Sequence, residues 1–188
     1  YVNQVGGQDE LVFDGTSMVF SRHARCEVTF PSFKPFSKII SFKKENNLIE
    51  VLTKKVQSRR SYLQDIYDAL VLGVKDYVEK NGFPGAIIGS SGGIDSALTA
   101  AIASDALGPE KVRTLMMPYE FTSKMSLEDA QSLANNLRVE YQVIPIKDVF
   151  SSFMKSLKFE FLNKGSDTTE ENLQSRCRGV ILMGISNK

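Results

Sequence analysis

The stretch Gly89-Ser-Ser-Gly-Gly-Ile-Asp-Ser96 constrains the fold more than any other part of the sequence. The apolar run 86–88 comes directly before it, and the apolar residues of 97–102 follow it at helical spacing. This order predicts a buried strand, a sharp turn and a helix. Such a turn directs backbone N–H groups and the N-terminus of a helix at one point, where they favour a phosphate group.

The side chains of the stretch suit a nucleotide phosphate. Gly92 and Gly93 allow a sharp turn and a close approach to a ligand, since neither has a Cβ atom. Ser91 and Ser96 add hydroxyl donors, whereas Asp95 fits an anion site only if a divalent cation accompanies the anion. Two glycines alone would indicate only a strand–helix turn with an N-capping residue. The complete string favours a phosphate site, and it matches neither Walker A, which needs a following Lys, nor Gly-x-Gly-x-x-Gly.

Strand and helix patterns alternate after this loop. Apolar runs at 112–117 and 141–146 predict two more strands, and helical periodicity covers 126–137, 148–161 and 169–181. The alternation predicts an α/β domain with a parallel sheet covered by helices on both faces. Ligands of such sheets bind at the carboxyl ends of the strands, where the phosphate loop and the 118–125 loop both fall.

Three helices carry predicted N-terminal signals. Ser61 with Gln64 and Thr168 with Glu171 have the spacing of capping boxes, and Ser126 with Asp129 indicates a third helix start. Asn172, Arg176 and Gly179 would share one face of the last helix, at positions i, i+4 and i+7. That face is either a solvated surface or the contact for a second phosphate-bearing substrate.

The N-terminal third is β-like. Short apolar runs in 1–30 are separated by Gly6-Gly7 and Asp14-Gly15, both of which we interpret as turns. Residues 31–59 have weak periodicity and two prolines, and we interpret them as a connector. The expected organisation is a β segment at 1–30, a connector at 31–59 and an α/β domain at 60–188.

The amino-acid composition argues against several classes of protein. Hydrophobic residues make up 42% and charged residues 24% of the 188 positions, with a net charge of +1, which is typical of a globular chain without a polyanionic partner. The two cysteines have no metal-type spacing, which fits a reducing cytoplasm. No apolar run approaches the ~20 residues of a membrane span. Because the chain opens and stops within structured patterns, we expect it to be a fragment.

Four blocks resemble one family. They are 1–15, Gly89–Ser96, 117–130 and Glu171-Asn-Leu-Gln-Ser-Arg-Cys-Arg-Gly179. The second block resembles the pyrophosphate loop of the ATP pyrophosphatases, and together the four are similar to the glutamine-dependent NAD synthetases over nearly the whole chain. Thr16, Ser90 and Ser175 depart from the family's usual residues. Block 1–15 resembles the late strands of a nitrilase-type glutaminase domain.

The resemblance implies a three-layer, Rossmann-like fold of the adenine nucleotide alpha hydrolase type, and a ligase that forms a C–N bond. Such an enzyme adenylates deamido-NAD with ATP and Mg²⁺, and ammonia released from glutamine then displaces AMP to give NAD. The resemblance assigns ATP or pyrophosphate to Gly89, Ser90, Ser91, Gly92, Gly93, Ile94, Asp95 and Ser96, Mg²⁺ to Asp95, and deamido-NAD to Asn172 and Arg176. It requires no catalytic protein nucleophile, and it implies a homo-oligomer for the full-length enzyme.

The resemblance also implies what such a chain lacks. The family's glutaminase Glu, Lys and Cys lie upstream of Tyr1, and its Thr-Gly-Asn-Lys-Ser-Glu segment follows Lys188, so we expect these 188 residues alone to be inactive. Two alternatives stay open. One is another ATP pyrophosphatase, such as a GMP synthetase, an asparagine synthetase or a tRNA thiolase, although the near-neutral charge disfavours tRNA. The other is a fragment that binds a nucleotide without turnover.

Overall fold

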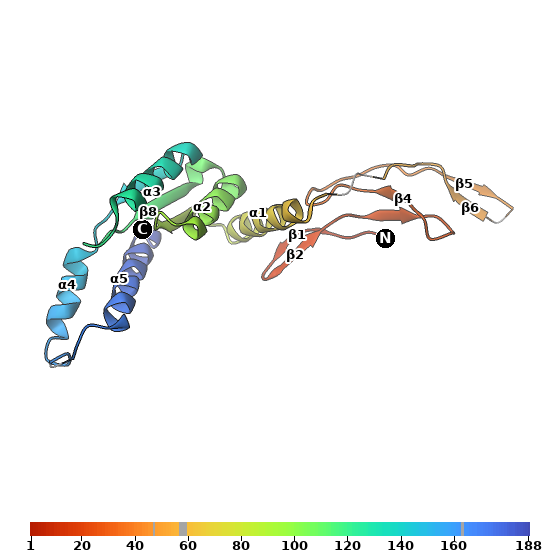
Figure 1. The fold of residues 1–188 in the computed structure, drawn as a ribbon. Helices are drawn as coiled ribbons and strands as arrows, with labels where there is room; N and C mark the ends of the chain where they lie inside the picture. Colours follow the sequence, from red (N-terminus) through yellow and green to blue (C-terminus); the bar gives the residue numbers. More distant parts are fainter. Residues whose placement is uncertain (47, 57–59, 163) are drawn as a thin grey trace. The chain divides into compact units, whose positions relative to one another are not determined.

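The computed structural model describes residues 1–46, 48–56, 60–162 and 164–188. These residues form two compact units, Tyr1–Gly82 and Phe83–Lys188 (Figure 1). The expected boundaries at 30 and 59 remain predictions, since the division by packing falls at a different place, after the helix that precedes Phe83.

The second unit is built on a parallel sheet of three strands. They are β7 (Ala86–Ser90), β8 (Val112–Met116) and β9 (Glu140–Val143), in the order β7-β8-β9. Hydrogen bonds continue past β9, because the N–H of Ile144 donates to Met116 O at 2.8 Å and that of Ile146 to Pro118 O at 3.0 Å. The predicted parallel α/β sheet is confirmed, with its three strands where the sequence places them.

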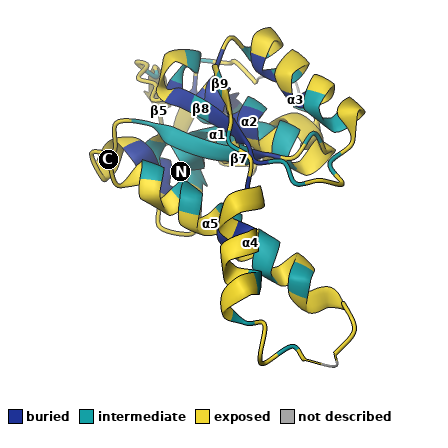
Figure 2. Ribbon diagram, turned by 90° about the vertical axis from the view of Figure 1, so that its left-hand side faces the viewer, coloured by how far each residue is buried: buried dark blue, intermediate teal, exposed yellow. Residues whose placement is uncertain are grey.

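Helices cover both faces of this sheet. The connections between strands are α2 (Ile94–Leu107), the short 3₁₀ helix η1 (Pro109–Lys111) and α3 (Lys124–Leu137). The sheet face opposite α2 and α3 packs against α4 (Lys147–Ser156) and α5 (Thr168–Ser186). The buried cluster on this side includes Leu115, Ile146, Phe150 and Cys177. Figure 2 shows buried residues concentrated on β8, as expected for the central strand.

The helix starts differ from two of the three predictions. Ser61 caps α1 (Tyr62–Lys80) as expected, accepting from Gln64 N at 3.1 Å. The cap of α3 is Ser123 rather than Ser126, and the capping box of α5 is Asp167 with Glu170 rather than Thr168 with Glu171. Each segment offers several hydroxyl or carboxylate residues in a row, so spacing alone does not select the one that starts the helix.

The first unit contains three β-hairpins and α1. The strands are β1 (Val5–Gln8) with β2 (Leu11–Asp14), β3 (Met18–Phe20) with β4 (Cys26–Thr29), and β5 (Phe42–Glu45) with β6 (Leu48–Val51). The expectation of a turn at Gly6-Gly7 is wrong, because both residues lie inside β1 and the chain turns at Asp9–Glu10. Asp9 takes the left-handed conformation there, with φ 51°.

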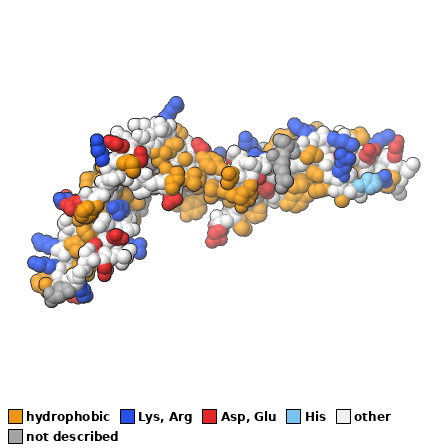
Figure 3. All heavy atoms as spheres, in the orientation of Figure 1, with side chains coloured by type: hydrophobic (Ala, Val, Ile, Leu, Met, Phe, Trp, Pro, Cys, Tyr) orange, Lys and Arg blue, Asp and Glu red, His pale blue; other side chains and the backbone are white. Residues whose placement is uncertain are grey.

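The segment interpreted as a connector is more ordered than expected. Its residues 42–51 include the hairpin β5–β6, with Glu45 paired to Leu48. The exposed, mixed-charge side chains of this hairpin hide the alternation that identifies a half-buried strand. The single histidine, His23, lies on the surface of the first unit, pale blue in Figure 3, and accepts a hydrogen bond from Arg22 at 3.0 Å.

None of the helices in the described ranges is both long enough and apolar enough to cross a membrane.

Candidate nucleotide site

The phosphate-loop stretch lies at the carboxyl end of β7, as predicted. β7 ends at Ser90 and α2 begins at Ile94, with Gly93 as its N-terminal cap. Gly92 has φ +78°, and a Cβ atom placed on it would lie 2.7 Å from Ser126 Cα and closer still to the oxygen of that residue. Both the backbone conformation and the close approach of α3 therefore require glycine at this position.

Two hydroxyl groups hold the loop in shape. Ser91 Oγ and Ser96 Oγ lie 3.0 Å apart, and Ser96 Oγ also accepts from Ser91 N at 3.2 Å and donates to Gly93 O at 3.0 Å. Ser91 Oγ accepts from Gly93 N at 3.2 Å. The loop is thus preformed, and both hydroxyls stand beside the N-terminus of α2, where an anion is favoured.

The first three residues of the loop stretch, Gly89, Ser90 and Ser91, line a cavity of about 590 Å³ at the carboxyl edge of the sheet, whereas Gly92, Gly93 and Ser96 are not among its lining residues. The cavity joins the ends of β7 and β8, the 118–125 loop and the middle of α5. Its lining residues are Gly89, Ser90, Ser91, Met116, Met117, Thr122, Ser175, Arg176, Arg178, Gly179 and Leu182. A predicted phosphate loop and the predicted α5 face therefore border one space, although they are far apart in the sequence.

Arg178 fixes α5 to the sheet. Its Nε donates to Met117 O at 3.0 Å, so a cation of α5 binds the carbonyl that follows the last residue of β8. Arg176 also lines the cavity, but it is exposed and forms no hydrogen bond or ion pair with another residue of the described ranges. Sequence reasoning selected Arg176 and missed Arg178, because nothing in a helical pattern shows that a distant carbonyl needs a donor.

Of the remaining predicted site residues, Ser90 lines the cavity, whereas Ile94, Asp95 and Asn172 do not. Ser90 is buried, at 6% exposure, and its hydroxyl has no hydrogen-bond partner among the residues with described positions. Ile94 and Asp95 lie exposed in the first turn of α2 and do not line the cavity. Asn172 is exposed in α5 and lies outside the cavity as well, one turn before Arg176.

The 118–125 loop is anchored on its α4 side. The Tyr119 and Phe150 rings meet edge to face with centroids 5.0 Å apart, and Lys147 forms an ion pair with Glu120 at 2.7 Å. The hydrogen bond that Lys147 donates to the Glu120 carboxylate raises the pKa of Lys147. Phe121, in contrast, is 88% exposed. The loop therefore has a fixed base and an exposed apolar tip close to the cavity.

No group of three or more His, Cys, Asp or Glu side chains converges to hold a metal ion within the described ranges. Asp95 is the acidic residue in the first turn of α2. One carboxylate still fits Mg²⁺, because this ion is usually held by one or two carboxylates together with substrate phosphates and water.

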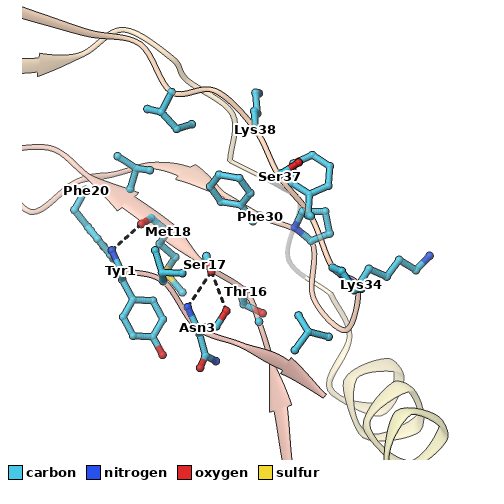
Figure 4. A pocket seen from close by; sticks show the side chains of 18 of the residues that line it. Tyr1, Asn3, Thr16, Ser17, Met18, Phe20, Phe30, Lys34, Ser37 and Lys38 are labelled. Atoms are coloured by element: carbon cyan, nitrogen blue, oxygen red, sulfur yellow. Dashed lines mark hydrogen bonds between the residues drawn. The ribbon is translucent and has the colours of Figure 1, made fainter. Parts of the chain in front are cut away.

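A second cavity, of 850 Å³, lies in the first unit, and Figure 4 shows its lining. Its walls are largely aromatic and aliphatic, with Lys34 and Lys38 at the edge. Several of its polar groups are engaged with one another: Asn3 N donates to Ser17 Oγ at 3.0 Å, and the amino terminus of Tyr1 donates to Met18 O at 3.1 Å. Among the described residues that line it there is no cysteine, histidine or carboxylate, and we assign no chemistry to it.

A parallel α/β sheet with a glycine-rich loop entering a helix at its carboxyl edge defines a nucleotide-binding domain of the PP-loop type. Comparison with known proteins then gives the family. The family model described as NAD synthase matches residues 66–188, and the chain belongs to this family.

The relatives found agree with this family. The chain is 45% identical to the glutamine-dependent NAD(+) synthetase of Acinetobacter baylyi and 41% identical to that of Thermotoga maritima, covering 100% of this chain in each case. It spans only about a third of these proteins, 34% and 38% of their lengths.

Solved structures show the same likeness. Glutamine-dependent NAD+ synthetase from Acinetobacter baumannii, determined in complex with ADP, has a TM-score of 0.93 and 48% identity, and covers 100% of this chain and 35% of that one. NH3-dependent NAD synthetase from Campylobacter jejuni has a TM-score of 0.60 and 30% identity, with 68% of this chain and 53% of that one covered.

Proposed function

We propose that this chain carries the ATP-binding core of a glutamine-dependent NAD synthetase, which amidates deamido-NAD in two steps. ATP first activates the nicotinate carboxylate as an adenylate with release of pyrophosphate, and ammonia then displaces AMP. The observation that carries the proposal is the 590 Å³ cavity, because it joins the start of the preformed phosphate loop, Gly89 to Ser91, to the Arg176 face of α5. Relatives with this name, matched over 100% of the chain, support it.

The phosphate loop would stabilise the departing pyrophosphate. Negative charge develops on this group as the α–β bond breaks, and fixed donors lower the energy of that state. The N–H groups at the start of α2 and the hydroxyls of Ser91 and Ser96 lie together for this role. The unpartnered hydroxyl of Ser90 is a further donor at the cavity wall, and bonding to a ligand would remove the cost of its burial.

Asp95 would hold Mg²⁺ against the phosphates, and the ion would neutralise their charge. Arg176 would bind a phosphate of deamido-NAD, since an exposed guanidinium in a cavity wall suits a phosphate group. Asn172, one turn away, would add a contact at the outer end of the same face. The reaction needs no protein nucleophile, because AMP is the leaving group that activates the carboxylate.

The direct test is to supply the full-length protein with ATP, Mg²⁺, deamido-NAD and either ammonium or glutamine. We expect NAD, AMP and pyrophosphate in equal amounts with both nitrogen sources. Nicotinate mononucleotide should be included as a competing acceptor, because the chain is also 25% identical to NMN synthetase from Francisella tularensis. ATP cleavage to ADP, or the absence of pyrophosphate, would refute the proposal.

A further inference from the structure

The first helix is bound to the N-terminal hairpin through the backbone of one glycine. Gly7 N donates to Asp76 Oδ2 at 2.7 Å, and Lys80 Nζ donates to Gly7 O at 2.6 Å. Asp76 and Lys80 also form an i,i+4 ion pair at 3.0 Å. One turn of α1 therefore satisfies both the N–H and the C=O of a single strand residue, and we call these three residues the Gly7 clamp.

Strand register explains why Gly7 is available. A two-residue turn makes Gln8–Leu11 the first hydrogen-bonded pair of β1–β2, so the next pair, Gly7–Val12, is the non-hydrogen-bonded kind. The N–H and C=O of Gly7 point away from β2 and would otherwise need water or another strand. Asp76 and Lys80 take the place of that strand.

The contact is too close to be an accidental surface pairing. A Cβ atom on Gly7 would lie 3.3 Å from Gly73 Cα and 3.3 Å from Asp76 Cβ. A Cβ atom on Gly73 would lie 3.3 Å from Val12 Cγ2, and one on Gly6 would lie 2.9 Å from Asp76 Oδ2. Glycines on both elements thus allow the helix backbone to approach the strand, and the Asp76 side chain is only 17% exposed as a result.

The clamp connects the β1–β2 hairpin to α1, and the known relatives do not all match both of these segments. The NAD synthase match begins at residue 66, so it includes Asp76 and Lys80 but neither β1 nor β2. Glutamine-dependent synthetases match 100% of the chain, whereas the NH3-dependent structure matches 68%. The hairpin is thus part of what this chain shares with the glutamine-dependent relatives, whereas most of α1 lies within the NAD synthase match.

We propose that Asp76 and Lys80 are positioning residues that make NAD synthesis usable with glutamine, while synthesis from free ammonia does not need them. This inference rests on the proposed function. Residues 81–85 link the end of α1 to β7, whose far end carries the phosphate loop. If the clamp opens, the hairpin shared with the glutamine-dependent relatives is no longer held to the helix that leads into the ATP site. Ammonia released from glutamine elsewhere in the full-length enzyme would then escape to solvent before it meets the adenylate.

Three substitutions in the full-length enzyme test this by separate routes. Asp76→Ala removes the acceptor and Lys80→Ala removes the donor. Gly7→Ala crowds Gly73 and Asp76, which must shift by a few tenths of an ångström, without changing any charge. The control is Glu79→Gln, which removes a charge from the same helix. The Glu79 side chain is exposed and makes no hydrogen bond or ion pair within the described ranges. NAD formation is measured with glutamine and with saturating ammonium, together with glutamate released per NAD.

We expect the ammonium-driven rate to stay within about twofold of wild type, while the glutamine-driven rate falls about tenfold, in line with the cost of misplacing reacting groups. Glutamate released per NAD should rise above the wild-type ratio, and Glu79→Gln should change neither value. An unchanged ratio of the two rates would overturn the inference, including a case in which both rates fall together as the variant unfolds. Absence of ammonium-driven synthesis in the wild type would instead refute the proposed function.

Discussion

Asp95 is the acidic side chain in the first turn of the helix that follows the phosphate loop. In the full-length enzyme we expect Asp95→Asn to lower kcat for ammonium-driven NAD formation about 100-fold, since metal-held charge compensation acts mainly in the transition state. The KM for deamido-NAD should change by less than about threefold. Steady-state kinetics at saturating Mg²⁺ make the measurement. Unchanged turnover would remove Asp95 from the site.

Substitution of Arg176 should change KM more than kcat, the reverse of what we expect for Asp95→Asn. Arg176→Met keeps the length of the side chain and removes a charged hydrogen bond of roughly 1.5–3 kcal/mol, so the KM for deamido-NAD should rise about 10- to 100-fold. We expect kcat to fall much less, because the proposed contact is with a phosphate of the substrate, which does not react. Asn172→Ala, at the outer end of the same face, should have a smaller effect. A fall in kcat with no change in KM would contradict this role.

Position 92 requires glycine for two reasons, its positive φ angle and the closeness of the Ser126 backbone. Gly92→Ala places a side chain at φ +78° against the backbone of Ser126, and we expect a loss of at least about 2 kcal/mol in the free energy of unfolding. Gly184→Ala is the control, because a Cβ atom there meets nothing within 4 Å in a helix, where Ala is favoured by up to about 1 kcal/mol. Thermal unfolding of both variants should give shifts of opposite sign.

The sequence is informative for residues such as Gly92, whose role follows from their immediate neighbours. It identifies the loop because the turn, the hydroxyls and the helix start are all local. It does not identify Arg178 or Asp76, because their partners, Met117 O and Gly7 N, are 61 and 69 residues away. Residues with distant backbone partners look like ordinary surface charges until the fold brings the two segments together.

At the scale of elements, predictions succeed where a buried face creates a clear period. The strands β7 and β8 and the helix α2 lie where apolar spacing places them, because the sheet buries them. The hairpin β5–β6 was not predicted, since its side chains are mostly exposed and its pairing depends on the backbone. The interpretation of Gly6-Gly7 as a turn failed for a related reason: these glycines allow close helix packing, not a change of direction.

The packing of α1 on β1 gives a prediction about pH. Burial would raise the pKa of Asp76, but the bonds from Lys80 and Gly7 outweigh it and lower this pKa below its usual value. The ionised form therefore stabilises the folded state above about pH 4, and this contribution is lost as the pH falls through the lowered pKa. Asp76→Asn should cost about 1–2 kcal/mol near pH 7.

Thermal unfolding of wild type and Asp76→Asn between pH 7 and pH 3 measures this effect. The difference in Tm should shrink toward zero on the acid side, where the wild-type carboxylate also becomes neutral. Glu79→Gln should show no such convergence. A constant difference across the whole range would mean that the Asp76 carboxylate does not stabilise the fold through its charge.

At the scale of the whole molecule, the 188 residues should bind nucleotide without completing the reaction. The phosphate loop needs only β7 and α2, both of which are present, so weak binding of ATP or pyrophosphate is expected. Adenylation needs adenine and substrate contacts as well, and the chain spans only 34% of a relative's length. Isothermal titration with ATP and an NAD-formation assay test the two parts. Appreciable NAD formation would show that the catalytic set lies within these residues.

Domain organisation was the hardest feature to derive from the sequence. Composition and turn signals predict that the α/β domain begins near residue 60, and this boundary stays a prediction. The family match begins at residue 66. Packing groups α1 with the first unit, which ends at Gly82. The start of the family match and the boundary found by packing differ because of α1. Most of this helix lies within the family match, but its close contacts hold it to the hairpin of the first unit.

The Gly7 clamp also has a consequence for solubility. A free strand edge with unpaired N–H and C=O groups is a template on which another chain can add a strand. At Gly7 this edge of β1 is occupied by the side chains of Asp76 and Lys80, which cannot extend a β-ladder. The same two charges that hold α1 in place thus shield the hairpin from edge-to-edge association. Variants that lack the Asp76 and Lys80 side chains should therefore aggregate through β1 as the protein concentration rises.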